Sequence, residues 1–266
     1  MELPGNVPTG APVRGLVIDL GGTVEVDGVP LPGALEAIRL LRRQRKRLLF
    51  LSNSTTEPRT RLLERLRSHG LDLGADELLT PPAAAARLLA SRGSPACLFV
   101  VREEIQSEFA GIPGDEDRPD YVVIGDIGER WDYPLMSRLF RLVMSGAKLL
   151  ALHKGRYWET QEGLALDIGA FIAGIEYATG IRAEVVGKPS SAYFEEAVAA
   201  LGLPIADVIA IGDDVDSDIG GAQAVGLRGV LVRTGKYRDD FAARSPVKPW
   251  RVINSVADLP RLLGIG

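Results

Sequence analysis

The chain has 266 residues, of which 46% are hydrophobic and 25% are charged, as in an ordinary globular protein. Its formal net charge is only −4 at pH 7, with 31 basic and 35 acidic residues. This balance provides no broad positive surface, so we expect neither nucleic acid nor a membrane as a partner. A single cysteine, Cys97, cannot form an internal disulfide.

No segment of the sequence predicts export or membrane insertion. Residues 1–12 are rich in Pro and Gly and lack the positive segment followed by an apolar stretch that marks a signal peptide. No uninterrupted apolar run approaches the roughly 20 residues that span a bilayer. We therefore expect a cytoplasmic protein.

Short apolar runs alternate with amphipathic stretches along most of the chain. This pattern is typical of parallel strands joined by crossover helices and predicts an α/β fold. Strands are expected at residues 15–20, 47–52, 207–211 and 229–232, and helices at residues 35–43, 59–69 and about 218–225. In such sheets ligands bind beside the carboxyl ends of the strands.

The middle of the chain continues the alternation but has few residue groupings that suggest chemistry. Apolar runs lie at residues 96–101, 121–124 and 148–152. The Pro81-Pro82 pair and the Gly187-Lys188-Pro189 segment interrupt the pattern at its two ends. We expect a core made of residues 1–80 and 187–266, with a second domain inserted at residues 81–186.

Polar residues lie at the carboxyl ends of the first two expected strands. Asp19 is followed by a Gly-Gly-Thr turn at residues 21–23, which can present its carboxylate to a ligand and free backbone groups for an anion. Ser52 and Asn53 end the second strand, where a hydroxyl and backbone N–H groups can donate to phosphate oxygens. Each segment also has a structural interpretation, as an aspartate-capped turn and as the N-cap of the next helix.

Two later segments carry charge. Lys188, held between Gly and Pro, can neutralise a phosphoryl group, or it can be an ordinary surface lysine. The third apolar strand is followed by four carboxylates in six residues, at Asp213, Asp214, Asp216 and Asp218. Their mutual repulsion is destabilising unless a cation or hydrogen-bond donors offset it. Hard oxygen ligands suit Mg²⁺, whereas one Cys and two His argue against zinc.

In this order, the Asp, the Ser, the Lys and the acidic segment match the four motifs of the haloacid dehalogenase-like hydrolase superfamily. The insertion is similar to the α/β cap of its NagD-like branch, and residues 153–157, 163–166, 186–189 and 234–237 resemble a subgroup of that branch. The resemblance extends from about residue 14 to residue 263. It implies a Rossmann-like parallel-sheet core with an inserted α/β cap domain.

The resemblance also implies a metal site. Asp19 would be the nucleophile that becomes an aspartyl-phosphate, and it would also be a ligand of Mg²⁺. Gly21 would offer its backbone carbonyl to the metal, Asp213 would be the second carboxylate ligand, and Asp218 would order the metal shell. A carboxylate nucleophile divides hydrolysis into two displacements, which the metal assists by offsetting negative charge.

A phosphate site is implied beside this metal. Ser52, the backbone of Asn53 and the Gly21 turn would hold the phosphoryl group, and Lys188 would pair with that group and with Asp19. The implied partner is a small phosphorylated substrate. Caps in this branch often support homodimers, so a homodimer is implied as well.

One position departs from the superfamily pattern. Most of these phosphatases carry a second Asp two residues after the nucleophile as the general acid, whereas this chain has Gly21. General acid catalysis typically contributes about 10²- to 10⁴-fold in rate. Either the substrate has a good leaving group, as in pyrophosphate, acyl or aryl phosphates and phosphoramidates, or another group substitutes, or catalysis has been lost.

These options leave two functions open. The first is a phosphatase for substrates with good leaving groups, and the alternative is a catalytically weak phospho-ligand binding or regulatory protein of the same fold. Dehalogenation by the same nucleophile is disfavoured, because displacement at a carbon–halogen bond needs no Mg²⁺ and leaves the acidic segment unexplained.

Overall fold

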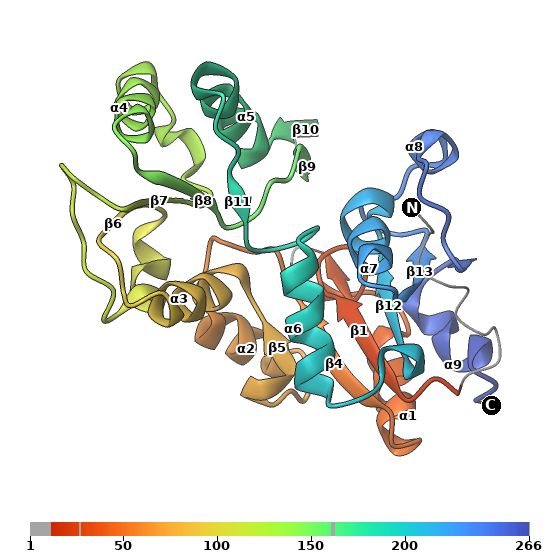
Figure 1. Ribbon diagram of the computed structural model, residues 1–266. Coiled ribbons are helices and arrows are strands. Elements are labelled where there is room, and N and C mark those ends of the chain that lie inside the picture. Colours follow the sequence, from red (N-terminus) through yellow and green to blue (C-terminus); the bar gives the residue numbers. More distant parts are fainter. Residues whose placement is uncertain (1–11, 27, 161–162, 266) are drawn as a thin grey trace. The chain divides into compact units, whose positions relative to one another are not determined.

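A computed structural model describes residues 12–26, 28–160 and 163–265 (Figure 1). The expectation about the first 12 residues therefore lies, apart from Pro12, outside the described residues. The chain divides into two compact units, one made of Met1–Ser52, Leu63–Leu79 and Pro189–Gly266 and one made of Asn53–Leu62 and Thr80–Lys188. Each unit has a parallel sheet with helices, so the predicted α/β, Rossmann-like fold class is confirmed.

The first unit has a six-stranded sheet with the order β14-β13-β12-β1-β4-β5, and every neighbouring pair in it is parallel. Its strands are β1 (Gly15–Asp19), β4 (Arg47–Leu51), β5 (Leu78–Leu79), β12 (Val208–Gly212), β13 (Arg228–Val232) and β14 (Arg251–Ile253). From β1 the chain continues to β4 and β5 on one side, whereas β12 to β14 extend on the other. The boundary of β1 and β12 is thus the topological switch point, where such sheets bind ligands.

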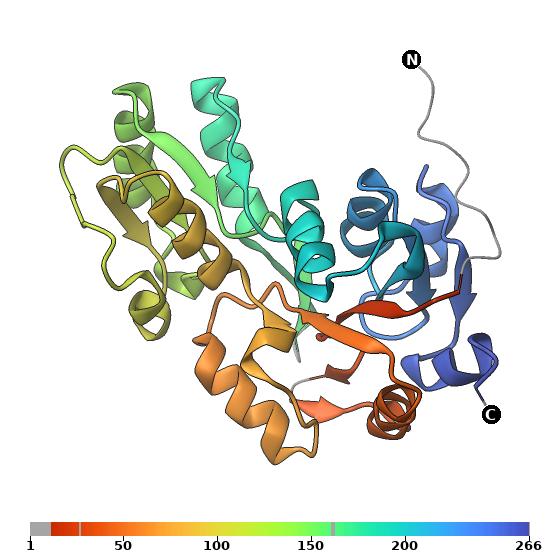
Figure 2. The same ribbon diagram turned by 60° about the horizontal axis from the view of Figure 1, so that its bottom comes forward.

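Helices cover both faces of this sheet: α6 and α7 lie on one face and α1 and α9 on the other (Figure 2). The helices of the unit are α1 (Ala34–Arg43), α6 (Ser191–Leu201), α7 (Gly221–Ala224), α8 (Asp239–Arg244) and α9 (Leu259–Leu262), and α2 (Arg59–Ser68) is divided between the units. Helical turns lie at Ala75–Glu77, Ile205–Asp207, Val215–Gly220 and Val256–Asp258, and a small hairpin joins β2 (Glu25–Val26) to β3 (Val29–Pro30). Helix α1 forms because Ala34, Ala37, Ile38 and Leu41 recur at helical spacing and are buried on one side.

The second unit has a parallel sheet of its own, with the order β11-β8-β7-β6. Its strands are β6 (Cys97–Val100), β7 (Tyr121–Ile124), β8 (Lys148–Ala151) and β11 (Glu184–Val185), with a hairpin of β9 (Tyr157–Thr160) and β10 (Gly163–Leu166). Its helices are α3 (Pro81–Ser91), α4 (Tyr133–Met144) and α5 (Ile168–Thr179), with turns at Glu103–Phe109 and Gly128–Arg130. Residues of β7, β8, α4 and α5 share one apolar core.

The helix expected from about residue 218 begins earlier than the sequence pattern predicts. A π-helical turn at Val215–Gly220 leads directly into α7. The start is shifted because the Asp214 side chain accepts the backbone N–H groups of Asp216 and Ser217, each at 3.0 Å, and so caps the first turn. In the part of the chain that the structure describes, no helix is long and apolar enough to cross a membrane.

Candidate active site

Three of the expected site residues lie at strand ends of the six-stranded sheet. Asp19 is the last residue of β1, Ser52 directly follows β4, and Asp213 directly follows β12. Strand β1 lies between β4 and β12, and all three strands are parallel. The fold therefore brings these residues to one edge of the sheet, at its switch point.

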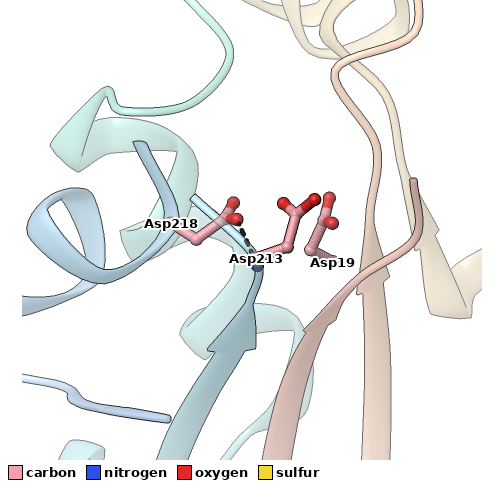
Figure 3. A group of neighbouring side chains, drawn as sticks. All are labelled: Asp19, Asp213 and Asp218. Atoms are coloured by element: carbon pink, nitrogen blue, oxygen red, sulfur yellow. Dashed lines mark hydrogen bonds between the residues drawn. The ribbon is translucent and has the colours of Figure 1, made fainter. Parts of the chain in front are cut away.

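Three buried carboxylates converge at this edge. Asp19, Asp213 and Asp218 each offer an oxygen, and these oxygens all lie within 4.8 Å of one another. Figure 3 shows the carboxylates of Asp19 and Asp213 side by side, with Asp218 reaching in from the neighbouring helical turn. Like charges this close are destabilising without a counter-charge, and three hard oxygen donors fit a divalent cation such as Mg²⁺.

The Asp19 side chain is oriented by its own turn. The hydroxyl of Thr23 donates to Oδ2 of Asp19 at 2.9 Å, and both residues are buried. The turn is fixed in place because the Gly22 N–H donates to the carbonyl of Glu25 at 2.7 Å, while the Glu25 carboxylate pairs with Arg65 at 2.8 Å. Sequence analysis assigned no role to Thr23. Its position four residues after Asp19 is the signal that could have identified it as a hydrogen-bond partner.

The carboxylates of the acidic segment have different structural roles. Asp214 caps the helical turn, and Asp216 accepts a hydrogen bond from the Ser245 hydroxyl at 2.8 Å. Asp218 instead folds back, and its Oδ2 accepts the backbone N–H of Asp213 at 3.1 Å (Figure 3). The same oxygen accepts the backbone N–H of Asp214 at 3.0 Å. Only Asp213 and Asp218 of this segment belong to the group of three carboxylates.

Gly21 would accept a side chain. An added Cβ would meet no atom within 4 Å, and Gly21 is not among the glycines with positive φ. The missing carboxylate at this position is therefore not imposed by crowding or by a left-handed backbone.

Ser52 is held through its backbone. Its N–H donates to the carbonyl of Leu79 at 3.1 Å, and its own carbonyl accepts the Tyr193 hydroxyl at 3.0 Å. Tyr193 is only 1% exposed and lies in the first turn of α6. Sequence analysis missed Tyr193, because no local pattern links a helical tyrosine to a strand end 141 residues away.

Asn53 and Lys188 lie together in the second unit. The Asn53 side chain donates from Nδ2 to the carbonyl of Lys188 at 3.1 Å, and its Oδ1 accepts the Lys188 N–H at 3.0 Å. A Cβ at Gly187 would come within 2.8 Å of Asn53 Oδ1, so only glycine allows this close approach. The expected residues thus form two groups, with Asp19, Gly21, Ser52, Asp213 and Asp218 in the first unit and Asn53 and Lys188 in the second.

The sequence matches family models and known proteins over most of its length. The model of the haloacid dehalogenase-like hydrolase family matches residues 16–112, and a second model of HAD-hydrolase-like proteins matches residues 185–259. Haloacid dehalogenase-like hydrolase domain-containing protein 2 of Homo sapiens is 40% identical over 226 residues, which cover 85% of this chain and 86% of that protein. Phospholysine phosphohistidine inorganic pyrophosphate phosphatase of Homo sapiens is 36% identical over 259 residues, or 95% of each chain.

Solved structures of two further proteins are similar to this chain in fold. The p-nitrophenyl phosphatase from Archaeoglobus fulgidus superposes with a TM-score of 0.87 at 31% identity, covering 94% of this chain and 99% of the other. NagD from E. coli K-12 has the same fold, with a TM-score of 0.81 at 24% identity over 93% of this chain and 98% of the other.

The chain therefore belongs to the haloacid dehalogenase-like hydrolase family. The expected resemblance to NagD is confirmed at the level of the fold, and the predicted class of enzyme, a phosphatase of this family, is confirmed by the relatives.

Proposed function

We propose that this chain is a Mg²⁺-dependent phosphatase that works through an aspartyl-phosphate on Asp19 and acts on small phosphorylated substrates with good leaving groups. The observation that carries the proposal is the convergence of three buried carboxylates within 4.8 Å at the switch point of the sheet. Asp19 and Asp213, with the carbonyl of Gly21, would hold the ion, and Asp218 would order its surroundings. Bound Mg²⁺ would supply the positive charge that lets an anionic nucleophile approach an anionic phosphoryl group.

The first displacement takes place at phosphorus. A carboxylate oxygen of Asp19 attacks, the bond from phosphorus to the leaving oxygen or nitrogen breaks, and the leaving group takes the electron pair. Water then attacks the phosphorus of the aspartyl-phosphate, which releases inorganic phosphate and restores the carboxylate. The hydrogen bond from Thr23 to Oδ2 supports this role, because it fixes the plane of the Asp19 carboxylate.

The remaining expected residues have roles in binding phosphate. We assign the Ser52 hydroxyl and the Asn53 N–H to the phosphoryl oxygens, with the Gly21 turn beside them, and Lys188 to charge neutralisation. The Tyr193 hydroxyl supports the Ser52 assignment because it holds the backbone at this residue. The Asn53 side chain supports the Lys188 assignment, since two hydrogen bonds fix the lysine main chain.

Gly21 limits the range of substrates. Without a carboxylate here, the leaving group must depart with little proton donation, which favours pyrophosphate, acyl and aryl phosphates and phosphoramidates. The names of two relatives agree with this class, since one acts on phospholysine, phosphohistidine and inorganic pyrophosphate and the other on p-nitrophenyl phosphate.

Gly21 also favours a second candidate function, a phospho-ligand binding or regulatory protein that keeps the anion site with little turnover. The two functions differ in whether phosphate is released catalytically.

The test is release of inorganic phosphate from p-nitrophenyl phosphate and pyrophosphate, with and without Mg²⁺. We expect Mg²⁺-dependent turnover that falls by more than about 10⁴-fold in Asp19→Asn. Asp216→Asn is the matched control, because it removes a carboxylate from the acidic segment outside the group of three. Turnover that survives Asp19→Asn contradicts the mechanism, and wild-type protein that binds phosphate without releasing it from any substrate supports the second function.

We further propose that residues 1–80 and 187–266 form the catalytic core and that residues 81–186 form an inserted cap that selects the substrate in a cytoplasmic homodimer. The separate sheets of the two units support the division into core and cap. Analytical ultracentrifugation tests the dimer, and a monomer at micromolar concentration contradicts it.

A further inference from the structure

The loop that follows β13 contributes no proposed metal ligand or phosphate-binding residue. It contains Thr234, Gly235 and Lys236, which we call the TGK loop, and it is one of the segments that resemble the subgroup of the NagD-like branch. Strand β12 separates β13 from β1 in the sheet. To reach the turn after β1, the TGK loop must therefore pass the end of β12, where Asp213 lies.

The first contact of the TGK loop is with the turn of the proposed nucleophile. The Thr234 hydroxyl donates a hydrogen bond to the carbonyl of Gly22, 212 residues away in the sequence. Gly22 is itself anchored, because its N–H donates to the carbonyl of Glu25 at 2.7 Å. Thr234 thus ties the loop after β13 to the turn after β1.

The second contact is with the proposed metal ligand. The backbone N–H of Lys236 donates to Oδ2 of Asp213 at 2.7 Å. Asp213 is only 3% exposed, so this hydrogen bond to a carboxylate is largely removed from water and is among the stronger kinds. It fixes the orientation of the carboxylate that faces Asp19 and Asp218.

Two glycines make both contacts sterically possible. Gly22 has φ +82° and Gly235 has φ +57°, and a Cβ added at either residue would overlap Oδ2 of Asp213. A Cβ at Gly235 would also collide with the backbone of Gly22. The backbones of the two loops therefore meet against the Asp213 carboxylate at positions where no other residue fits.

We propose that the TGK loop is a positioning element for the divalent-cation site. The Lys236 N–H orients the Asp213 carboxylate. The Thr234 hydroxyl fixes the position of the TGK loop, and thereby of Asp213, relative to the turn after Asp19. The inference rests on the proposed function, because it assigns Asp213 to the cation. Removing a residue that orients a metal ligand typically weakens metal affinity by about 10- to 100-fold, and we expect that range here.

The test is calorimetric titration of the full chain with MgCl₂ alone, without substrate. Gly235→Ala should raise the Kd for Mg²⁺ by about 10- to 100-fold, because the new Cβ displaces the Asp213 carboxylate. Gly264→Ala is the matched control, since Gly264 has a similar φ of +69° but no atom within 4 Å of an added Cβ. It carries the same backbone strain and should keep the wild-type Kd. Folded Gly235→Ala that binds Mg²⁺ like wild type overturns the inference.

A second pair of variants applies even if Gly235→Ala fails to fold. Thr234→Val removes the hydroxyl that reaches Gly22 and should weaken Mg²⁺ binding. Thr234→Ser keeps that hydroxyl and should bind Mg²⁺ with the wild-type Kd. A merely structural role would lower the melting temperature of Thr234→Val without changing the Kd for Mg²⁺, and that outcome overturns the inference.

Asp213→Asn separates the inference from the proposed function. Equal Mg²⁺ binding by wild type and Asp213→Asn overturns the metal site itself and both proposals with it. If Asp213→Asn loses binding while Gly235→Ala and Thr234→Val keep it, only the role of the TGK loop is wrong.

Discussion

The edge of the six-stranded sheet and the second unit differ in how their carboxylates are arranged. At the edge of the six-stranded sheet, Asp19, Asp213 and Asp218 lie together within 4.8 Å. Asp19 accepts a hydrogen bond from a hydroxyl, and Asp213 and Asp218 accept hydrogen bonds from backbone N–H groups. The arrangement orients the carboxylates and brings three like charges close to one another.

In the second unit, acidic side chains are paired with basic ones. The buried Glu176 accepts a hydrogen bond from Lys154 at 2.6 Å, and the exposed Glu184 accepts one from Arg92 at 2.7 Å. Pairing of this kind offsets charge within the protein and requires no ligand. The fold class alone therefore does not create a metal site, since both sheets are parallel and, among the described residues, the group of three carboxylates lies at the edge of the first.

The largest expected effect comes from removing one charge of the first group. Asp213→Asn should lose Mg²⁺-dependent turnover by at least about 10³-fold, because a ligand of the ion is gone. Without Mg²⁺, the free energy of unfolding should hold or rise, because repulsion falls while the amide oxygen can still accept the Lys236 N–H. Kinetics and urea unfolding with and without Mg²⁺ check both parts. If Asp213→Asn is less stable than wild type in the absence of Mg²⁺, repulsion among the three carboxylates is not the dominant effect and the prediction is wrong.

A second change adds a carboxylate to the turn that follows Asp19. Gly21→Asp restores the position of the general acid and should raise hydrolysis of alkyl phosphates selectively, by up to about 10²- to 10⁴-fold. The open space around Gly21 makes the substitution feasible. Without Mg²⁺ this variant should be less stable than wild type, the opposite of Asp213→Asn.

The wild-type enzyme supplies the control for this prediction. Its rate of phosphoryl transfer should fall steeply as the pKa of the leaving group rises, so that aryl phosphates are transferred faster than alkyl phosphates. A flat dependence would mean that another residue donates the proton and that our account of Gly21 is wrong.

The third prediction breaks a pair in the second unit. Glu176→Gln should lower the free energy of unfolding by about 1–3 kcal/mol, because Lys154 loses a charged partner in a largely buried environment. The loss should be the same with and without Mg²⁺, and the Kd for Mg²⁺ should not change. A loss that Mg²⁺ reverses would contradict the contrast between the units.

The smallest effect concerns pH. The hydrogen bond from Arg92, outweighing the effect of burial, lowers the pKa of Glu184 below its usual value. A lowered pKa in the folded state stabilises the protein above the unfolded pKa of about 4.3, and this stability is lost as pH falls through the folded pKa. Arg92→Gln should therefore flatten the decline of unfolding free energy below about pH 5.

Urea unfolding between pH 3 and pH 6 measures this slope. Arg138→Gln is the control, because its partner Glu116 is exposed and a surface pair contributes little. An unchanged slope in Arg92→Gln would show that the pair does not contribute to acid stability.

The positions of the reactive groups along the sheet could be predicted from the sequence. Asp19, Ser52 and Asp213 each follow a run of apolar residues, and parallel strands place such residues on one edge. The α/β class followed from the same alternation, because buried parallel strands give continuous apolar runs. Two-residue strands such as β5 were missed, since two residues carry no periodic signal.

Which of these groups act together could not be predicted, because it depends on how distant segments pack. Asp214 and Asp218 are equivalent in the sequence pattern, but one caps a helical turn and the other folds back onto the Asp213 backbone. Thr234 reaches Gly22 across 212 residues of sequence. Hydrogen bonds depend on distance and angle between atoms, and for residues on different strands these are fixed by packing rather than by neighbours in the chain.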